Sequence, residues 1–267
     1  MERSSLRQSI STADGKQRYV RRLFATIADR YDFITGFLSY GQDRRWKRRL
    51  IQLARLEPSD RVLDLACGTG DIVSVAAPQV ERAVGLDITH RMLQLAMQRA
   101  DLPPAGGSHE LAHSGHPLAS ARLRQVASAF RRKACFVTGD MLALPFPDCS
   151  FTVVTIGYGL RNVPDLQQSL REIRRVLTPQ GRVLSLDFNR PSNPIVRGVY
   201  LIYLTIVGSA LGLALHGDPD TYRYIPESIR NYPGAVGVAR MMEELGFTDV
   251  RAVRVLGGLM SIHTARR

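Results

Sequence analysis

Residues 61–71 read RVLDLACGTGD, and this stretch decides the fold. The apolar run Val62, Leu63 and Leu65 predicts a strand that is buried on both faces, as in a parallel sheet. Gly68 and Gly70 then predict a turn in which a ligand can approach the backbone closely. The backbone N–H groups of the helix that follows would face that ligand. The stretch therefore predicts the first half of a βαβ unit with a binding site over its turn.

An acid at the end of the next predicted strand supports a nucleoside-binding role for this turn. Asp87 ends the next apolar run, residues 83–86, and follows Gly70 by 17 residues. In a βαβ unit an acid at this place reaches the hydroxyls of a bound ribose. The third glycine of the dinucleotide pattern G-x-G-x-x-G is missing, so the ligand is not predicted to be a dinucleotide.

Length and cysteine content limit the class of protein. The chain has 267 residues, which is enough for one large domain or one domain with an attached cap. Its three cysteines, Cys67, Cys135 and Cys149, are scattered and odd in number, which favours a reducing compartment over a disulfide framework. No metal-binding spacing occurs among them, and no apolar signal segment occurs in residues 1–16. We expect a cytoplasmic protein without a metal site.

The charge is strongly positive and unevenly placed. The formal net charge is +12, and residues 1–55 hold 13 Lys or Arg against 5 Asp or Glu. A field of this sign attracts nucleic acid, anionic lipid or acidic substrates, and it does not choose among them.

The N-terminal part predicts a mobile segment followed by a helical cap. Residues 1–16 are polar and Ser-rich, which is typical of a mobile terminus. Residues 17–58 predict the cap, with one helix from Val20 and a second over 44–56. Trp46 lies among arginines and a lysine in the second helix. This pattern suits a membrane interface, and it equally suits a core anchor beneath a solvated basic face.

Residues 59–267 predict the main domain, in which strands and helices alternate. Further strands are expected near 135–137, 151–156 and 181–187, and a helix is expected over 165–177. Strands near 248–255 and 260–264 would close the sheet with an antiparallel edge hairpin. The fold class is therefore α/β, a Rossmann-like, doubly wound, seven-stranded and mostly parallel sheet with a ligand crevice at its carboxyl edge and a helical cap.

Two segments interrupt this rhythm. Residues 101–134 predict an insertion with a basic amphipathic helix over 119–134, and His109, His113 and His116 lie close together in it. Metal binding there is conceivable, but no cysteine or carboxylate cluster accompanies the histidines, so a solvated insertion is favoured. The second segment, residues 190–232, is expected to add to the cap.

Residues 198–215 within that segment are 18 residues without a charge. By length alone a membrane-spanning helix is allowed. Three glycines, two tyrosines and the flanking Arg197 favour instead a cap helix over an apolar pocket, or a helix lying on a bilayer.

Several motifs together resemble a known family. Residues 67–71, CGTGD, resemble motif I of the S-adenosylmethionine-dependent methyltransferases. The further motifs RYD, RRWKR, ALPFPD, GLRNV and DPDTYRYIPESIR resemble the ubiquinone/menaquinone biosynthesis C-methyltransferases, and they lie at 30–32, 44–48, 143–148, 159–163 and 218–230. The resemblance runs from about Val20 to the C-terminus, except for the insertion.

The resemblance implies S-adenosylmethionine as cofactor and implies the residues that bind it. Asp64 would face the methionine ammonium group and Asp87 the ribose. The implied cofactor contacts are Asp64, Gly68, Thr69, Gly70, Asp87, Asp140, Met141 and Gly157. Many relatives carry serine where this chain has Gly157, so one side-chain hydrogen bond would be absent or replaced.

The implied reaction is methylation of a ring carbon of a polyprenylated hydroquinone. The product would be menaquinol from demethylmenaquinol, the corresponding benzoquinol of the ubiquinone pathway, or both. A phenol becomes nucleophilic at carbon when its proton leaves, so the site needs a base or a cation that stabilises the phenolate. An arginine keeps its proton, so we assign electrostatic stabilisation through a water to Arg161, with Asn162 orienting it. Arg161 as a structural ion-pair partner is the alternative.

Other residues are expected on the substrate side of the site. Tyr31, from the cap, would hydrogen-bond the ring oxygens. Tyr222, Arg223 and Arg230 would line the substrate pocket. Because a polyprenyl tail does not dissolve, we expect the protein to associate peripherally with the inner face of a membrane, and a homodimer is compatible with the sequence.

Three other functions are compatible with parts of the sequence. A nucleic-acid methyltransferase would explain the charge, but residues 157–160 read GYGL where amino-methylating enzymes carry an Asn/Asp-Pro-Pro-aromatic motif, and no Pro-Cys nucleophile is present. We therefore expect no nucleic-acid partner. A methyltransferase of another small lipophilic acceptor, or a cofactor-binding scaffold without turnover in a quinone-biosynthesis complex, stays open.

Overall fold

The computed structural model describes residues 6–39, 41–100 and 133–267. The predicted insertion, with its histidines and its basic helix, lies outside the described residues except for its last two positions.

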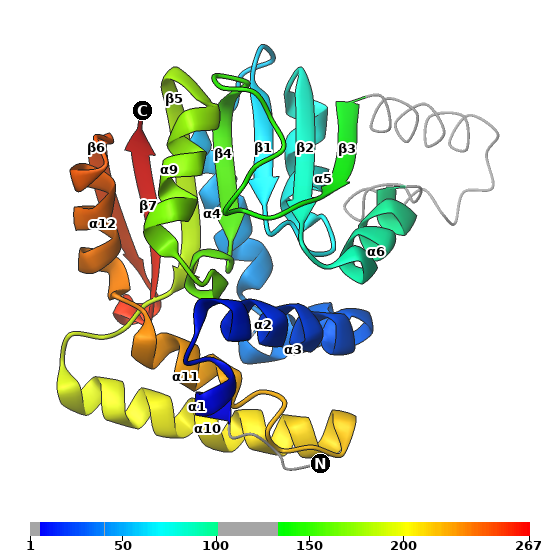
Figure 1. Ribbon diagram of the computed structural model, residues 1–267, viewed down its shortest axis with the longest axis vertical. Coiled ribbons are helices and arrows are strands. Elements are labelled where there is room, and N and C mark those ends of the chain that lie inside the picture. The colour runs from blue at the N-terminus through cyan, green and yellow to red at the C-terminus, as the bar shows by residue number, and fades with distance from the viewer. Residues whose placement is uncertain (1–5, 40, 101–132) are drawn as a thin grey trace.

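A single seven-stranded sheet forms the centre of the molecule (Figure 1). Its strands follow the order β3-β2-β1-β4-β5-β7-β6, and only β7 runs antiparallel to its neighbours β5 and β6. The strands are β1 (Arg61–Leu65), β2 (Arg82–Asp87), β3 (Ala134–Thr138), β4 (Phe151–Gly157), β5 (Leu177–Phe188), β6 (Thr248–Val255) and β7 (Met260–Arg266). The predicted fold class and edge hairpin are confirmed, although β5 starts earlier than the sequence indicates.

Helices cover both faces of the sheet because the strand residues alternate between them. Val62 of β1 packs into the cluster formed with α4 (Asp43–Ala54), α5 (Asp71–Ala76) and α6 (His90–Ala100). Its neighbour Leu63 packs into the cluster on the opposite face, formed with α9 (Leu166–Val176) and α12 (Gly234–Glu244). The expected acidic cap of α9 is present, since the Asp165 carboxylate accepts a hydrogen bond from Gln168 N.

Trp46 is a core anchor. Its side chain is 6% exposed and packs with Leu50 and Ile51 of the same helix against the sheet. The arginines of α4, Arg44, Arg45, Arg48 and Arg49, are exposed on the other side of the helix. Of the two interpretations that the sequence allowed, the structure supports the core anchor beneath a solvated basic face.

A helical layer lies below the carboxyl ends of the parallel strands (Figure 1). Its members are α1 (Leu6–Ser9), α2 (Ala13–Ile27), η1 (Ala28–Arg30), α3 (Tyr31–Leu38), α10 (Pro194–His216) and α11 (Tyr224–Asn231). Helix α2 begins inside the segment that the sequence predicted to be mobile, because the Thr12 hydroxyl accepts a hydrogen bond from Gly15 N and caps it. Segments from both halves of the chain therefore cover the crevice.

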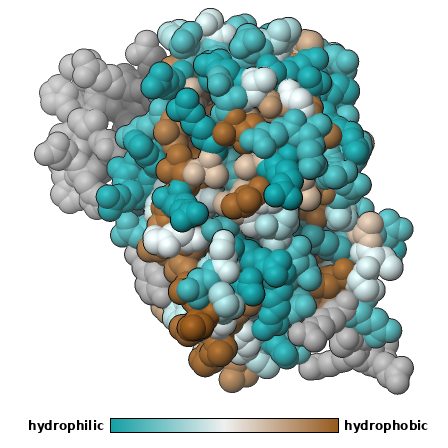
Figure 2. Space-filling model, turned by 90° about the vertical axis from the view of Figure 1, so that its left-hand side faces the viewer, coloured by the Kyte–Doolittle hydropathy of each residue, from teal (hydrophilic) through white to brown (hydrophobic). Residues whose placement is uncertain are grey.

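Helix α10 has one face packed on the protein and one face exposed. Tyr200, Leu201 and Leu204 are buried against α11. The helix is long and apolar enough to cross a membrane by length and composition, with a mean hydropathy of 1.9, but only 22% of its apolar window is buried in the protein. Apolar side chains are gathered at the lower edge of the molecule, where α10 lies (Figure 2).

Candidate active site

The turn after β1 brings its backbone against the end of β2. Gly68 has φ +54° and Gly70 has φ +80°, which is the left-handed region that favours glycine. A Cβ at Gly70 would lie 3.1 Å from the ring of Phe136. The Gly68 N–H donates to Oδ2 of Asp87 at 2.9 Å, so the turn and the predicted ribose-binding acid are fixed to each other.

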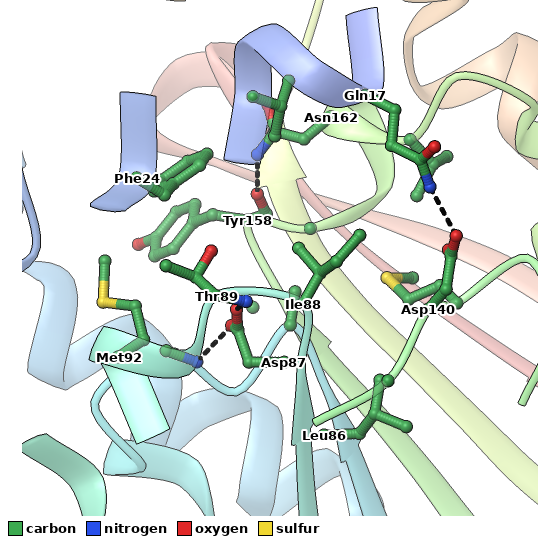
Figure 3. Close-up of a pocket in the computed structure, with 18 of the residues that line it drawn as sticks. Gln17, Phe24, Leu86, Asp87, Ile88, Thr89, Met92, Asp140, Tyr158 and Asn162 are labelled. Carbon is green, nitrogen blue, oxygen red and sulfur yellow. Dashed lines mark hydrogen bonds between the residues drawn. The ribbon is translucent and has the colours of Figure 1, made fainter. Parts of the chain in front are cut away.

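Asp87 presents an oriented carboxylate to the cleft. Its Oδ1 accepts a hydrogen bond from Thr89 N at 2.8 Å, and the side chain is buried (Figure 3). Burial raises the pKa of Asp87, and the hydrogen bonds from Thr89 and Gly68 act in the opposite direction. The Thr89 side chain also hydrogen-bonds this carboxylate, and the acceptor capacity that remains can serve a ligand.

A cleft with about 720 Å³ of empty space lies above the ends of β1, β2 and β4. Its walls bring together seven of the residues predicted for the site: Tyr31, Gly68, Asp87, Asp140, Met141, Gly157 and Asn162. Helix α2 supplies three further lining residues, Gln17, Val20 and Phe24, which the sequence did not indicate (Figure 3).

Asp140 connects the sheet edge to the cap. Its Oδ1 accepts a hydrogen bond from Leu142 N at 2.9 Å, and its Oδ2 accepts one from the side-chain amide of Gln17 (Figure 3). Lys16 Nζ, next to Gln17, donates to the carbonyl oxygens of Arg161 and Val163. The first turns of α2 are thus tied to loops on both sides of the cleft.

Three other predicted cofactor residues, Asp64, Thr69 and Gly70, lie beneath the cleft surface and do not line it. Asp64 is buried, and its Oδ1 accepts a hydrogen bond from the Thr155 hydroxyl at 2.7 Å. Its Oδ2 has no partner among the described residues. Burial raises the pKa of Asp64 to about 7. The Thr69 hydroxyl donates to Asp32 of the cap at 2.9 Å.

Gly157 lines the cleft where many relatives would have a serine. A Cβ at this position would lie 3.0 Å from Cδ1 of Ile72, which is the far end of a flexible side chain. A larger residue at this position would therefore need only a small movement of the Ile72 side chain.

A second cavity, with about 620 Å³ of empty space, adjoins the first. Phe24, Tyr31 and Tyr158 line both cavities, so the two meet at these side chains. Most of the other lining residues are apolar or aromatic: Leu23, Ile27, Ile34, Leu38, Phe188, Tyr222, Tyr224 and Ile225.

Arg161 lines the second cavity and is held from two sides. Its Nη1 lies 3.4 Å from Oδ1 of the fully buried Asp187, and its guanidinium lies 4.8 Å from the ring centroid of Phe188. Burial raises the pKa of Asp187, and the charge of Arg161 acts in the opposite direction. Arg161 is thus an ion-pair partner, as the alternative interpretation expected, and it also lines the cavity, while its role in stabilising a phenolate stays a prediction.

Asn162 does not contact the Arg161 side chain directly. Its Nδ2 donates to the carbonyl oxygen of Tyr158 at 2.8 Å, and Arg161 Nη1 approaches the same oxygen at 3.5 Å. Tyr158 has φ +63°, a conformation that is strained for a residue with a Cβ. Asn162 therefore supports the turn that carries both Tyr158 and Arg161.

A buried polar network lies behind the junction of the cavities. The Tyr158 hydroxyl donates to Oδ1 of Asp43 at 2.8 Å, and Asp43 Oδ2 pairs with Lys47 Nζ at 2.8 Å. Lys47 also pairs with Asp71 at 2.7 Å. Tyr31 lies within the influence of Lys47 and Asp43, and burial raises its pKa.

The residues predicted for the substrate side divide into two groups. Tyr222 lines the second cavity and its hydroxyl lies 2.8 Å from Nε2 of His216. Arg223 and Arg230 are exposed and line neither cavity, since they pair with Asp220 at 2.8 Å and with Glu227 at 2.9 Å. Tyr224, between them, faces the cavity instead.

The sequence did not indicate these residues as members of the site: Gln17, Val20, Phe24, Asp43, Lys47, Tyr158 and Tyr224. Asp43, Lys47, Tyr158 and Tyr224 fall within or beside the motifs at 44–48, 159–163 and 218–230, so position in a motif was the signal that could have found these four. Within the described residues, no group of three or more His, Cys, Asp or Glu side chains could hold a metal ion.

The family model that matches this chain covers nearly all of it. Residues 12–106 and 110–267 match the model of the ubiE/COQ5 methyltransferase family. The chain belongs to the ubiE/COQ5 methyltransferase family. It is an S-adenosylmethionine-dependent methyltransferase, and the predicted family and enzyme class are confirmed.

Relatives in this family align over almost their whole length. The demethylmenaquinone methyltransferase of Roseiflexus castenholzii is 36% identical, over 94% of this chain and 94% of its own. The ubiquinone/menaquinone biosynthesis C-methyltransferase UbiE of Teredinibacter turnerae is 34% identical, over 96% of this chain and 94% of its own.

Solved structures bear out the fold. A methyltransferase dependent on S-adenosylmethionine from Thermotoga maritima superposes with a TM-score of 0.57, at 14% identity, over 92% of this chain and 98% of its own. This likeness concerns the fold.

The residues of the cleft fit the cofactor that the ubiE/COQ5 family implies. A nucleoside needs hydrogen-bond acceptors for its ribose, and the Asp87 carboxylate lines the cleft with part of its acceptor capacity unused. The glycine turn leaves the cleft open at Gly68, where the nearest atom to an added Cβ is 3.8 Å away. Oδ1 of Asn162, which lines the cleft, has no partner among the described residues.

Proposed function

We propose that this protein transfers a methyl group from S-adenosylmethionine to a ring carbon of a polyprenylated hydroquinone. The observation that carries the proposal is the meeting of two cavities at Phe24, Tyr31 and Tyr158. One cavity has the acids and the open glycine turn suited to a nucleoside. The other has the apolar and aromatic walls suited to a prenylated ring.

We assign the first cavity to the cofactor. Asp87 accepts hydrogen bonds from the ribose, and Asp140 with Met141 binds the base beside Gln17. Gly68 and Gly157 keep the backbone close to the ligand. Asp64, Thr69 and Gly70 support the turn from below, and Asp64 attracts the methionine ammonium group. When bound, S-adenosylmethionine supplies a methyl group on a sulfonium whose leaving group is neutral.

We assign the second cavity to the acceptor ring. Arg161 stabilises the phenolate that forms when a hydroxyl of the ring loses its proton, because its guanidinium stays charged. Asn162 supports the Arg161 turn, Tyr31 holds the ring at the junction and Tyr222 lines the far wall. Over the reaction the ring carbon gains the methyl group and loses its hydrogen as a proton, so the hydroquinone is regenerated.

Methyl transfer to defined acceptors tests this proposal. The purified protein is incubated with labelled S-adenosylmethionine and a short-tailed demethylmenaquinol or the corresponding benzoquinol lacking the methyl group. Each quinol is kept chemically reduced, and the oxidised quinones serve as controls. We expect label in one or both quinols and none in the quinones, which have no phenolic proton to lose.

An Arg161→Lys variant separates an enzyme from a scaffold. We expect turnover to fall by about 100-fold, because lysine keeps the charge but not the planar set of donors. Binding of cofactor without methylation of either quinol would leave the family membership intact and overturn the proposed substrate. Full activity of the variant would show that Arg161 does not contribute to the reaction.

We further propose that the protein binds the inner face of a membrane peripherally, through α10. Ile195, Val199, Ile202, Ile206 and Leu213 recur at helical spacing and are each 61–76% exposed. The opposite face of the helix is packed on the protein, where Gly208 and Gly212 leave room for residues 218–222. A helix with one bound face and one apolar exposed face suits a position in the plane of the bilayer surface.

Flotation with vesicles tests this second proposal. We expect the protein to float with vesicles of phosphatidylcholine and phosphatidylglycerol, and Ile202→Glu with Ile206→Glu to abolish flotation. Val236→Glu is the matched control, since Val236 is 64% exposed on α12, away from α10. Release by high salt alone would assign the binding to the basic residues instead. Loss of a homodimer in the α10 variant, with flotation unchanged, would assign the face to a second copy.

A further inference from the structure

The second cavity contains one tyrosine hydroxyl that has no partner. Four tyrosines line this cavity: Tyr31, Tyr158, Tyr222 and Tyr224. Three of the hydroxyls have partners on the chain: that of Tyr31 pairs with Thr35, that of Tyr158 with Asp43, and that of Tyr222 with His216. The Tyr224 hydroxyl has none among the described residues, although the side chain is only 1% exposed.

A second unpartnered donor lies on the same cavity. Arg161 is 6% exposed, and its Nε–H has no acceptor among the described residues. The rest of the guanidinium contacts Asp187 and the ring of Phe188. Arg161 and Tyr224 are close enough for the arginine charge to act on the phenol: burial raises the pKa of Tyr224, and Arg161 opposes that rise.

Buried donors without acceptors are rare in folded proteins, because each loses its hydrogen bonds to water. Two such donors on one cavity, one of them charged, match a ligand oxygen that carries negative charge. Among the described residues no carboxylate accepts from either donor, and Asp187 is already bound by Arg161 Nη1 and by the Arg161 and Phe188 backbone N–H groups.

We propose that the Tyr224 hydroxyl and Arg161 Nε–H together donate hydrogen bonds to one ring oxygen of the acceptor. Tyr224 is then a substrate-binding residue that stabilises the phenolate. The identification of the acceptor as a phenol rests on the proposed function. The Tyr224 hydroxyl and Arg161 Nε–H are then the donors that recognise the ionised oxygen. Arg223 and Arg230 lie on the surface and cannot reach this oxygen.

The variant Tyr224→Phe removes only the hydroxyl. Tyr232→Phe is the matched control, because the Tyr232 hydroxyl is also buried and unpartnered but lies in the core and lines neither cavity. Loss of a hydroxyl that bonds to nothing in the protein leaves the melting temperature of both variants unchanged or higher. A lower melting temperature of Tyr224→Phe, or a failure to fold, would show a structural partner for the hydroxyl and overturn the proposal.

The binding of a prenylated 4-nitrophenol reads the interaction without turnover. Its absorbance reports whether the bound phenol is ionised, in the presence of S-adenosylhomocysteine. We expect the wild-type protein to lower the pKa of the bound probe, and Tyr224→Phe to raise it again by about one unit, a tenfold change. Tyr232→Phe should match the wild type. An equal probe pKa in Tyr224→Phe and wild type, or no binding of the probe to the wild type, would overturn the proposal.

Turnover supplies a second readout. With a reduced quinol, we expect kcat of Tyr224→Phe to fall by about 100-fold while KM changes far less, because the hydrogen bond is strongest to the charged oxygen. A change confined to KM would overturn the phenolate role. If the wild type methylates no quinol but still lowers the probe pKa through Tyr224, the proposed function fails and this inference stands.

Discussion

The Tyr158 hydroxyl lies 2.8 Å from Oδ1 of Asp43 and joins the junction of the two cavities to a buried carboxylate on α4. The residues are 115 positions apart in the chain. Asp43 is held in turn by Lys47, whose second partner Asp71 begins α5. The cap, the first βαβ unit and the end of β4 are therefore connected by one chain of charge-assisted hydrogen bonds.

We predict that Asp43→Asn destabilises the protein by about 2 kcal/mol, as expected for the loss of a hydrogen-bonded charge. Asparagine keeps an acceptor for Tyr158, and Lys47 keeps Asp71, so the loss is smaller than for an unpaired buried charge. Urea unfolding measures the change. Asp148→Asn, at an exposed ion pair with Arg175, is the control and should cost less than about 1 kcal/mol. Equal effects of the two variants would contradict this reading of the network.

Asp87→Asn should weaken the binding of S-adenosylmethionine by about 10- to 100-fold, because an amide offers one acceptor where the carboxylate offers two. Isothermal titration calorimetry gives the affinity. The fold should persist, since the asparagine oxygen can still accept from one of the two backbone N–H groups. An unchanged affinity would place the ribose elsewhere in the cleft.

Asp64 should make stability depend on pH in a defined direction. Its pKa in the folded protein is about 7, above the value of 3.8 for an unperturbed side chain. The folded state therefore binds more protons than the unfolded state between these values, and this contribution to stability falls as the pH rises towards 7. Asp64→Asn removes the effect. The free energy of unfolding of the variant, relative to that of wild type, should therefore be roughly 2 to 3 kcal/mol higher at about pH 8 than at about pH 5. Urea unfolding at both pH values measures the difference, and a constant difference would refute the assigned pKa.

Gln17→Ala should speed the release of the cofactor several-fold. The variant removes the hydrogen bond that ties α2 to Asp140 at the rim of the cleft. Stopped-flow fluorescence measures the dissociation rate. Arg21→Ala, on the exposed side of the same helix, should release the cofactor at the wild-type rate. A similar rate for all three proteins would mean that α2 does not limit release.

Local patterns in the sequence predicted the central site. The strand, glycine turn and acid at residues 61–87 depend on contacts within one βαβ unit, and the structure brings Gly68 and Asp87 within 2.9 Å. The substrate side could not be predicted in the same way. Neighbouring residues on a helix point about 100° apart. Tyr224 is therefore buried while Arg223 is exposed, and the motif that holds both cannot distinguish them.

Long-range contacts create the other features of the candidate site that the sequence did not predict. Asp43 meets Tyr158 only because α4 packs on β5 and α5 next to the turn that follows β4, and Gln17 meets Asp140 only because α2 borders the cleft. No spacing in the sequence encodes either approach. Trp46 illustrates the same limit: its cationic neighbours suited two environments, and the packing of α4 on the sheet decided between them.

Helix α2 contributes Phe24 to both cavities and borders the first cavity with Gln17 and Val20. A ligand in either cavity would therefore bear on the position of the same helix, and through it on the shape of the other cavity. If one ligand changes the affinity for the other in this way, the second changes the affinity for the first by the same factor, even without contact between the two ligands.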